Sequence, residues 1–162
     1  MKMCNAEILK KIKLLEQSKS DVLSKENRTH QVTYQEEKDR YDYGYSFSLT
    51  RETVCGLDAE IRKLRHLLNI SNATTAVPEF EMTLGECLVY LAQLNNELGI
   101  VSRMAKKETT TTNTTYGGKV EYTALNYSKE ECQAKADWLQ NTIAQLQIAI
   151  DRTNLTNMID AE

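Results

Sequence analysis

Apolar residues recur every three or four positions along four stretches of the chain, which is the spacing that one face of an α-helix requires. The stretches cover residues 5–25, 49–70, 84–107 and 129–153. In the second of them the apolar positions are Val54, Leu57, Ile61, Leu64 and Leu68. Stripes this regular bury against another helix at a shallow crossing angle. The pattern predicts a mainly all-α fold, with four long helices packed as antiparallel hairpins in a coiled-coil-like bundle.

The starts of the third and fourth stretches carry a second helix signal. Thr83-Leu-Gly-Glu86 and Ser128-Lys-Glu-Glu131 both have the capping-box pattern, in which a hydroxyl and a carboxylate bond the free amides at a helix N-terminus. Pro78 lies between the second and third stretches. A proline at this place suits a short helical-hairpin connection.

Two of the helical stretches end in the same phrase. LRHLLNISNATT at residues 64–75 and LQIAIDRTNLTN at residues 146–157 align when one is shifted by 82 positions. Asn72 then falls on Asn154, and Thr74 falls on Thr156. An apolar helical face that stops at [Ser/Thr]-Asn-x-Thr is therefore written twice, which indicates related structural roles for the two helices.

Two connections are too long to be simple turns. Residues 29–48 are dense in tyrosine and acid, and residues 108–127 are dense in threonine. Each connection holds a short β-like run, at residues 31–34 and 119–123, and Gly117-Gly118 supplies a tight turn before the second run. We expect a small β-hairpin from the two loops, or pairing with a copy in another subunit. The rest of the threonine tract would be a mobile polar loop tip.

Length and composition limit the class of protein. A chain of 162 residues fits a single domain, 1–162, and its one proline and six glycines favour long helices over a turn-rich all-β fold. A net charge of −3 argues against a nucleic-acid partner. No segment approaches the ~20 apolar residues that cross a bilayer, and the first residues lack the apolar core of a secretion signal. We expect a cytoplasmic protein with no membrane partner.

The repeated helix endings are the most specific candidate site. Two helix C-termini that meet would gather Asn72, Thr74, Asn154 and Thr156 into a polar cluster for a ligand. The alternative, which we favour, is that each asparagine adopts the left-handed backbone of a C-cap while the hydroxyls bond the last carbonyls.

Tyrosines supply a second candidate. The alternation Tyr41-Asp-Tyr43-Gly-Tyr45 places three phenols on one side of an extended segment. Such a platform can stack on a nucleobase or contact another subunit, because tyrosine joins apolar area to a polar tip. Packing over the end of the bundle is the favoured alternative. Arg62 and Arg65 are the basic residues that a ligand site would recruit.

The sequence contains no pattern typical of a catalytic site. His30 and His66 are far apart and lack metal-ligand spacing, and the four cysteines include no CxxC pair. There is no phosphate-binding glycine loop and no GxSxG. We therefore predict no catalytic residues, no metal and no cofactor.

Residues 60–95, EIRKLRHLLNISNATTAVPEFEMTLGECLVYLAQLN, resemble the septicolysin-like family of small bacterial proteins. Family members have a helix that ends in Asn-x-[Ser/Thr]-Asn-x-Thr, a short link, and then Leu-x-x-Ala-Leu or similar. Here these parts are residues 69–74, the link through Pro78, and residues 83–88, and the resemblance extends to the final helix. Gly85 and Cys87 depart from the pattern. The resemblance implies a helical, coiled-coil-like fold.

Three functions remain open from the sequence. The leading hypothesis is a non-enzymatic bacterial scaffold or protein-interaction module that forms a homo-oligomer, or binds another protein, through its helices. The second is a small-molecule or nucleotide-binding module that uses the Asn/Thr helix ends and the tyrosines. The third, a membrane-acting toxin, comes from the family name only, and the apolar stripes are sized for helix packing rather than lysis.

Overall fold

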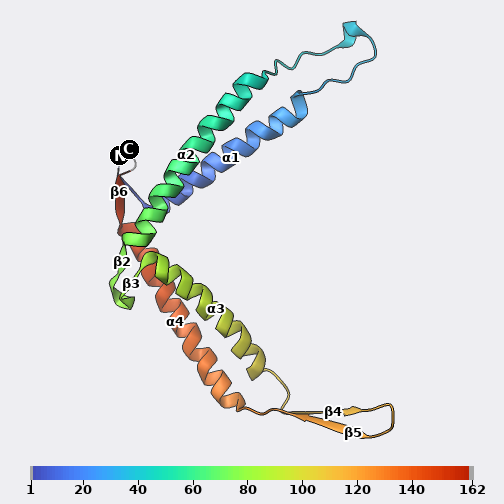
Figure 1. Ribbon diagram of the computed structural model, residues 1–162, viewed down its shortest axis with the longest axis vertical. Coiled ribbons are helices and arrows are strands. Elements are labelled where there is room, and N and C mark those ends of the chain that lie inside the picture. Colours follow the sequence, from blue (N-terminus) through green and yellow to red (C-terminus); the bar gives the residue numbers. More distant parts are fainter. Residues whose placement is uncertain (1, 161–162) are drawn as a thin grey trace. The chain divides into compact units, whose positions relative to one another are not determined.

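The computed structural model describes residues 2–160 and is mainly helical (Figure 1). Its four long helices are α1 (Asn5–Thr29), α2 (Phe47–Thr74), α3 (Leu84–Ala105) and α4 (Lys129–Thr156). Each begins or ends within about one turn of the boundary expected from the apolar stripes. The mainly all-α prediction is confirmed, while coiled-coil packing of the helices stays a prediction.

Within residues 2–160, six short strands pair as three antiparallel ribbons. β1 (Lys2–Cys4) pairs with β6 (Met158–Asp160), β2 (Ala76–Val77) with β3 (Met82–Thr83), and β4 (Thr110–Thr114) with β5 (Val120–Ala124). Two 3-10 turns, η1 (Glu37–Asp39) and η2 (Pro78–Phe80), lie in the connections. Each ribbon has only two strands, so its stability depends on what it packs against.

Backbone contacts divide the chain into two compact units. Within the described residues, unit 1 comprises residues 2–75 and 154–160, and unit 2 comprises residues 76–153. Helix α4 therefore belongs to unit 2 except for its last turn. Each unit has a two-stranded ribbon at the base of a helical hairpin, and unit 2 also contains the β4–β5 ribbon between α3 and α4.

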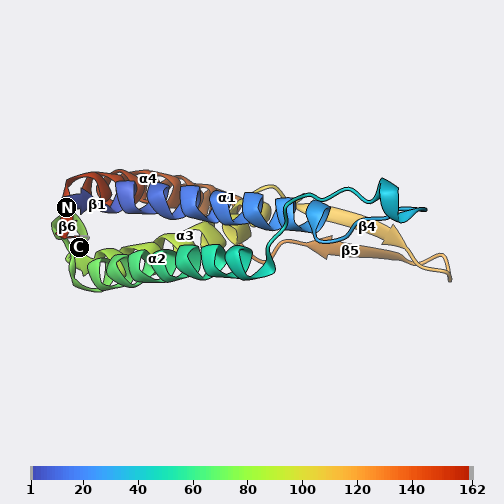
Figure 2. The same cartoon turned by 90° about the horizontal axis from the view of Figure 1, so that it is seen from above.

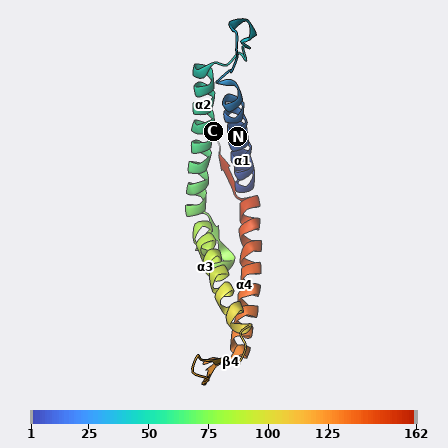
Figure 3. The same cartoon turned by 90° about the vertical axis from the view of Figure 1, so that its right-hand side faces the viewer.

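In unit 1, α1 and α2 run antiparallel and side by side (Figures 1 and 3). The ion pairs Lys11–Glu60, at 2.7 Å, and Lys19–Asp58, at 2.6 Å, connect the two helices. The buried apolar core lies near the β1–β6 ribbon and consists of Met3, Ile8, Ile12, Ile61 and Leu64. Farther along, the helices meet through charged and half-buried side chains.

Unit 2 has the larger apolar core, between α3 and α4 and against the β2–β3 ribbon. Its buried members are Val77, Leu84, Cys87, Leu94, Leu139, Ile143, Leu146, Ala149 and Ile150. Cys87 and Leu94 on α3, and Leu139, Ile143, Leu146 and Ile150 on α4, belong to the apolar stripes of the third and fourth stretches. Leu84, Ala149 and the ribbon residue Val77 are further members that the stripes did not include. Leu84, Leu139 and Leu146 are completely buried.

The internal repeat seen in the sequence extends over whole elements. Helices α2 and α4 have 28 residues each, and both their first and last residues are 82 positions apart. The strands that follow them, β2 and β6, begin at Ala76 and Met158, again 82 positions apart. The prediction of related structural roles for the two helices is confirmed.

The repeat also begins earlier than the shared ending suggested. Tyr45-Ser46 precedes α2, and Tyr127-Ser128 precedes α4, at the same 82-residue offset. Each serine hydroxyl accepts a bond from an amide in the first turn of its helix, at 3.5 Å for Ser46 and 3.2 Å for Ser128. The Ser128 hydroxyl also donates to a carboxylate oxygen of Glu130. The capping-box pattern predicts Glu131 as the acidic partner of Ser128, so the acidic partner differs from the prediction.

Helix α3 begins with the predicted capping box. The Thr83 amide donates to Glu86 Oε2 at 2.8 Å, and the Glu86 amide donates to Thr83 Oγ1 at 3.2 Å. The corresponding position before α1 is Cys4, whose amide donates to Glu7 Oε2 at 2.8 Å. The backbone hydrogen bonds of the Thr83 box lower the pKa of the Glu86 carboxyl.

Three local expectations are wrong. Asn72 and Asn154 lie inside α2 and α4 rather than in left-handed caps, and within residues 2–160 the non-glycine residue with positive φ is Glu81. The link at Pro78 is a two-stranded ribbon around η2, not a simple helical turn. The threonine tract forms strand β4 instead of a mobile tip, because the Gly117-Gly118 turn lets it pair with β5.

The hairpin at the second connection therefore comes from one loop. Residues 31–34 form no strand, and β5 takes its partner from its own connection. A local partner closes only a short loop, which costs less conformational entropy than pairing with a distant segment. Across residues 2–160, no helix combines the length and the apolar character that crossing a bilayer requires.

Candidate functional site

A network of hydrogen-bonded polar side chains lies in unit 1 where α1 begins and α2 ends. We call it the polar node, and its members are Asn5, Ser71, Thr75, Asn154 and Asn157. Ser71 Oγ donates to Asn5 Oδ1 at 2.9 Å, and Asn5 Nδ2 donates to Asn154 Oδ1 at 3.2 Å. The Asn157 amide donates to both Ser71 Oγ and Thr75 Oγ1 at 2.9 Å.

The hydrogen bonds of the polar node affect stability because two of its residues are buried. Asn5 is completely buried and Ser71 is 5% exposed. A buried amide that loses its partners costs about 1–3 kcal/mol, whereas a satisfied one contributes modestly. The node therefore specifies which segments meet at the base of unit 1, since residues 66 and 149 positions away from Asn5 must all be present to satisfy it.

The structure brings only part of the predicted Asn/Thr cluster together. Asn154 is in the polar node, and Asn72 is a half-buried residue within α2. Thr74 Oγ1 donates to the Ile70 carbonyl at 2.9 Å, which confirms that a hydroxyl bonds one of the last carbonyls of α2. Thr156 is the last residue of α4. Ser71 and Asn157 lie within the repeated helix endings but were not chosen as site residues, and Asn5 carried no recognisable local signal in the sequence.

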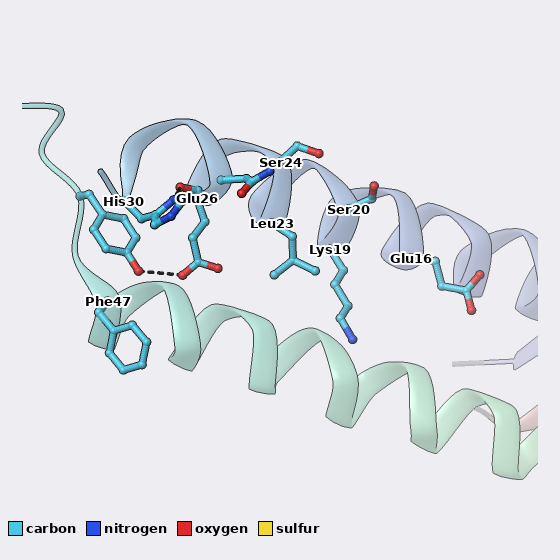
Figure 4. A pocket seen from close by; sticks show the side chains of 10 residues that line it. Glu16, Lys19, Ser20, Leu23, Ser24, Glu26, His30 and Phe47 are labelled. Carbon is cyan, nitrogen blue, oxygen red and sulfur yellow. Dashed lines mark hydrogen bonds between the residues drawn. The ribbon is translucent and has the colours of Figure 1, made fainter. Parts of the chain in front are cut away.

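A second feature of unit 1 is a groove of about 780 Å³ near the other end of α1. Figure 4 shows it along α1, bounded by the start of α2 and the segment before it. Its lining includes the apolar side chains of Leu23 and Phe47, the His30 ring and the Tyr45 phenol. The Tyr45 hydroxyl donates to Glu26 Oε1 at 2.7 Å, and Arg51 forms an ion pair with the same carboxylate.

These contacts shift two pKa values in opposite directions. The hydrogen bond from Tyr45, with the neighbouring Arg51 guanidinium, lowers the pKa of Glu26. The same hydrogen bond raises the pKa of Tyr45. The pair is therefore most stable as a neutral phenol on a charged carboxylate, which is its state at neutral pH.

The charged groups of the groove are already paired. Lys19 binds Asp58, and Glu16 forms an ion pair with Arg65. Glu26 is shared by Tyr45 and Arg51. A ligand recognised by charge would have to displace one of these partners, so the groove offers mainly apolar area and the His30 ring.

The other candidate tyrosines and arginines do not line the groove, although Arg65 reaches its rim through the ion pair with Glu16. Tyr41 and Tyr43 contact each other edge to face, with ring centres 4.8 Å apart, and both are exposed. Arg62 and Arg65 lie on the exposed surface of α2 beside His66. Asn154 touches the first residue of α1 and Tyr45 touches its twenty-second, so about 30 Å of helix separates them. One small ligand does not span both.

Reactive groups are sparse among residues 2–160. No cluster of three or more His, Cys, Asp or Glu side chains there has the arrangement of a metal site. The four cysteines are free thiols, with Cys4 and Cys87 buried and Cys55 exposed. Burial and nearby acids raise the pKa of the Cys87 thiol, which keeps it protonated and unreactive.

Comparison with known proteins places the fold. No protein-family model matches the chain, and no curated protein matches it. A crystal structure of a functionally unknown conserved protein from Corynebacterium diphtheriae is similar over 99% of this chain and 100% of that one. The TM-score is 0.72 and the sequence identity is 19%. The two proteins share a fold, at an identity that carries no activity from one to the other.

Proposed function

We propose that this protein is a non-enzymatic interaction module that associates with copies of itself. The supporting observation is the set of large apolar side chains that the helices of unit 2 leave exposed. Exposed apolar side chains grouped on one face mark protein–protein contact sites. In a two-helix unit, each helix packs one face against the other helix and leaves the opposite face bare, so that area remains for a partner.

Large apolar side chains lie on the bare faces in unit 2. Val89 and Ile100 on α3 are 60% and 43% exposed, and they lie about three turns apart on the same side of the helix. Trp138 and Ile148 on α4 are 49% and 59% exposed. Burying such side chains contributes about 1.5–3 kcal/mol each. We assign the outer face of α3 as the primary contact between copies.

Sedimentation equilibrium of the purified protein tests this assignment. We expect a homo-oligomer for the unmodified chain, and a smaller species for the double variant Val89→Asp with Ile100→Asp. The matched control is Leu9→Asp with Leu14→Asp, which places the same charges on exposed apolar positions of α1 outside the groove. A chain that stays monomeric at the highest concentration would rule out self-association. Equal dissociation by both variants would argue against α3 as the specific contact.

A second function is supported by the groove of unit 1. Its apolar lining, with Leu23, Tyr45 and Phe47, fits a small planar molecule rather than an anion, because the groove carboxylates and Lys19 are already paired. Native mass spectrometry checks it directly. A bound mass of a few hundred daltons that disappears in Phe47→Ala would promote this function above the first.

We keep the septicolysin-like family, the cytoplasmic location and the absence of enzyme activity as parts of the proposal. The helical fold and the apolar stripes support the first. Lytic activity is not proposed, since the described helices include none suited to crossing a bilayer. Release of dye from liposomes by the purified protein would reverse that position.

A further inference from the structure

The β4–β5 ribbon of unit 2 stands apart from the core of its unit. Every residue of both strands is exposed. Figure 1 shows the ribbon extending beyond the ends of α3 and α4, and Figure 2 shows its two strands lying side by side. An isolated two-stranded hairpin is marginally stable in water. A ribbon of this kind gains stability when a further strand joins one of its edges.

The two edges differ in their protection. Strand β4 reads Thr-Thr-Thr-Asn-Thr and holds no charge and no proline. Strand β5 carries Glu121 and directly follows Lys119, so charged side chains lie on this strand and beside it. Natural proteins use such charges, with proline and bulges, to keep edge strands from pairing. The β4 edge lacks these devices over its whole length.

The register shows which backbone groups point outward from β4. The Thr115 amide bonds the Lys119 carbonyl, and the Leu125 amide bonds the Thr109 carbonyl. In an antiparallel pair the inward bonds fall on alternate residues. Thr111 and Asn113 therefore bond β5, and the N–H and C=O groups of the remaining β4 residues face the free edge. These residues are Thr110, Thr112 and Thr114.

We propose that β4 pairs with β4 of a second copy of this chain, antiparallel and centred on Thr112. About a two-fold axis at this residue, Thr110 lies opposite the partner's Thr114, and the outward groups of all three threonines find partners. Thr111 then lies opposite the partner's Asn113, so no like charges meet. Threonine pairs of this kind are favourable cross-strand neighbours. The result is a four-stranded sheet.

The ribbon's two faces agree with this arrangement. Val120, Tyr122 and Ala124 share one face with the outward-bonded threonines, and Glu121 and Thr123 lie on the other. A two-fold axis perpendicular to the sheet keeps equivalent faces on the same side. The paired ribbons therefore form one sheet whose common face carries threonines on the two inner strands and Val120, Tyr122 and Ala124 on each outer strand.

This inference rests on the proposed self-association and adds a second contact to the α3 face. Substitution by proline at each of the two ribbon edges tests this inference. Thr112→Pro removes an outward N–H and leaves the β4–β5 bonds intact, because Thr112 donates no bond within the ribbon. Ala124→Pro makes the same change on the β5 edge and is the matched control. We expect Thr112→Pro to weaken the association by about tenfold or more, equivalent to ~1.4 kcal/mol, with Ala124→Pro unchanged.

Hydrogen exchange supplies an independent readout. In the unmodified protein, the amides of Thr110, Thr112 and Thr114 should gain protection as protein concentration rises. In Thr112→Pro the amides of Thr110 and Thr114 should need about tenfold more protein to reach the same protection. Both observations are made on the full chain.

The outcomes separate this inference from the proposed function. An oligomer that is lost in the α3 double variant but unchanged in Thr112→Pro would overturn β4 pairing and leave self-association standing. Dissociation by Ala124→Pro alone would also overturn it, since the β5 edge would then be the contact. A chain that is monomeric throughout would overturn both.

Discussion

The first helices of unit 1 and unit 2 begin with the same kind of cap, but the buried residue that follows the cap is polar in unit 1 and apolar in unit 2. Cys4 and Thr83 each precede a helix and each have a glutamate three residues later whose carboxylate accepts the cap amide. The next residue is Asn5 in unit 1 and Leu84 in unit 2, and both are completely buried. The base of unit 1 combines a polar node with a small apolar core, and the base of unit 2 is held by a larger apolar core.

The two units therefore show that a completely buried residue at this position can be held either by hydrogen bonds or by apolar packing. Five apolar residues form the buried cluster of unit 1, against nine in unit 2. Unit 2 should therefore be the more stable, and unit 1 the more dependent on one exact set of partners. Buried polar groups cost stability when they lose a partner, and they disfavour alternative pairings for the same reason.

The largest expected effect comes from charging the apolar core. Leu94→Asp with Leu146→Asp places two carboxylates where the leucines are 3% and 0% exposed. Each buried, unpaired charge should cost about 4 kcal/mol or more, so helical circular dichroism should fall sharply. Ile148→Asp, at a position that is 59% exposed, is the control and should leave the spectrum unchanged. A double variant that stays fully helical would contradict the core assignment.

Exchanging the residue types of Asn5 and Leu84 tests directly whether the two units depend on different interactions. Asn5→Leu leaves Asn154 without its partner and should cost about 2 kcal/mol in chemical unfolding. Leu84→Asn buries an unsatisfied amide in an apolar core and should cost about 3 kcal/mol. Asn72→Leu, at the position of α2 that corresponds to Asn154, should cost less than Asn154→Leu. If the asparagine and leucine exchange without loss in either unit, the polar node has no specifying role.

The caps offer a smaller contrast. Thr83→Ala removes a hydroxyl that accepts the Glu86 amide and should lower the free energy of unfolding by about 1 kcal/mol. Cys4→Ala removes a sulfur, which is a weak acceptor, and should cost less through this bond. Thermal unfolding of both variants measures the difference. Equal losses would mean that the packing of the buried Cys4 side chain outweighs its role as a cap.

The smallest expected effect distinguishes Tyr45 from Tyr127, the tyrosines that precede α2 and α4. Tyr127 donates to the Met104 carbonyl at 3.0 Å, whereas Tyr45 donates to the Glu26 carboxylate. Tyr45→Phe should therefore raise the pKa of Glu26 toward its ordinary value, as followed by NMR of the side-chain carbonyl. Tyr127→Phe should leave it unchanged, and is the matched control.

The sign of the pH dependence follows from the same pair. Because the pKa of Glu26 is lowered on folding, its contribution is present above the unfolded value and is lost as the pH falls through the folded one. The raised pKa of Tyr45 contributes below the unfolded phenol value and is lost as the pH rises through the folded one. Glu26→Gln should flatten the acid limb of the stability profile. An unchanged acid limb would show that this pair is broken in solution.

Local signals in the sequence predicted the helices well. The apolar stripes located all four, and Thr83-Leu-Gly-Glu86 predicted a capping box that the structure contains. The shared helix endings pointed to a repeat that proves to include the preceding Tyr-Ser pair and the following strand. These features depend on residues within a few turns of one another, so periodicity and spacing reveal them.

Long-range contacts were the part that sequence reasoning missed. The polar node joins Asn5 to residues at the far ends of α2 and α4, and nothing near Asn5 indicates those partners. The left-handed caps expected at Asn72 and Asn154 were wrong because both helices continue for two residues past them and enter strands. Of the ligand-site residues predicted from sequence, Asn154 and Tyr45 occur at two separate places, the node and the groove.

The pairing of β1 with β6 has a consequence for the order in which the chain folds. Lys2 lies opposite Asp160 in this ribbon, whereas Ala76 lies opposite Thr83 in the other. During synthesis, residues 76–153 supply everything that unit 2 needs, but unit 1 waits for residues 154–160 to leave the ribosome. The first hairpin to be made is thus the last to be completed. Until residues 154–160 arrive, Asn5 keeps its bond from Ser71 but lacks Asn154, and the core of unit 1 lacks the cover of Ile159.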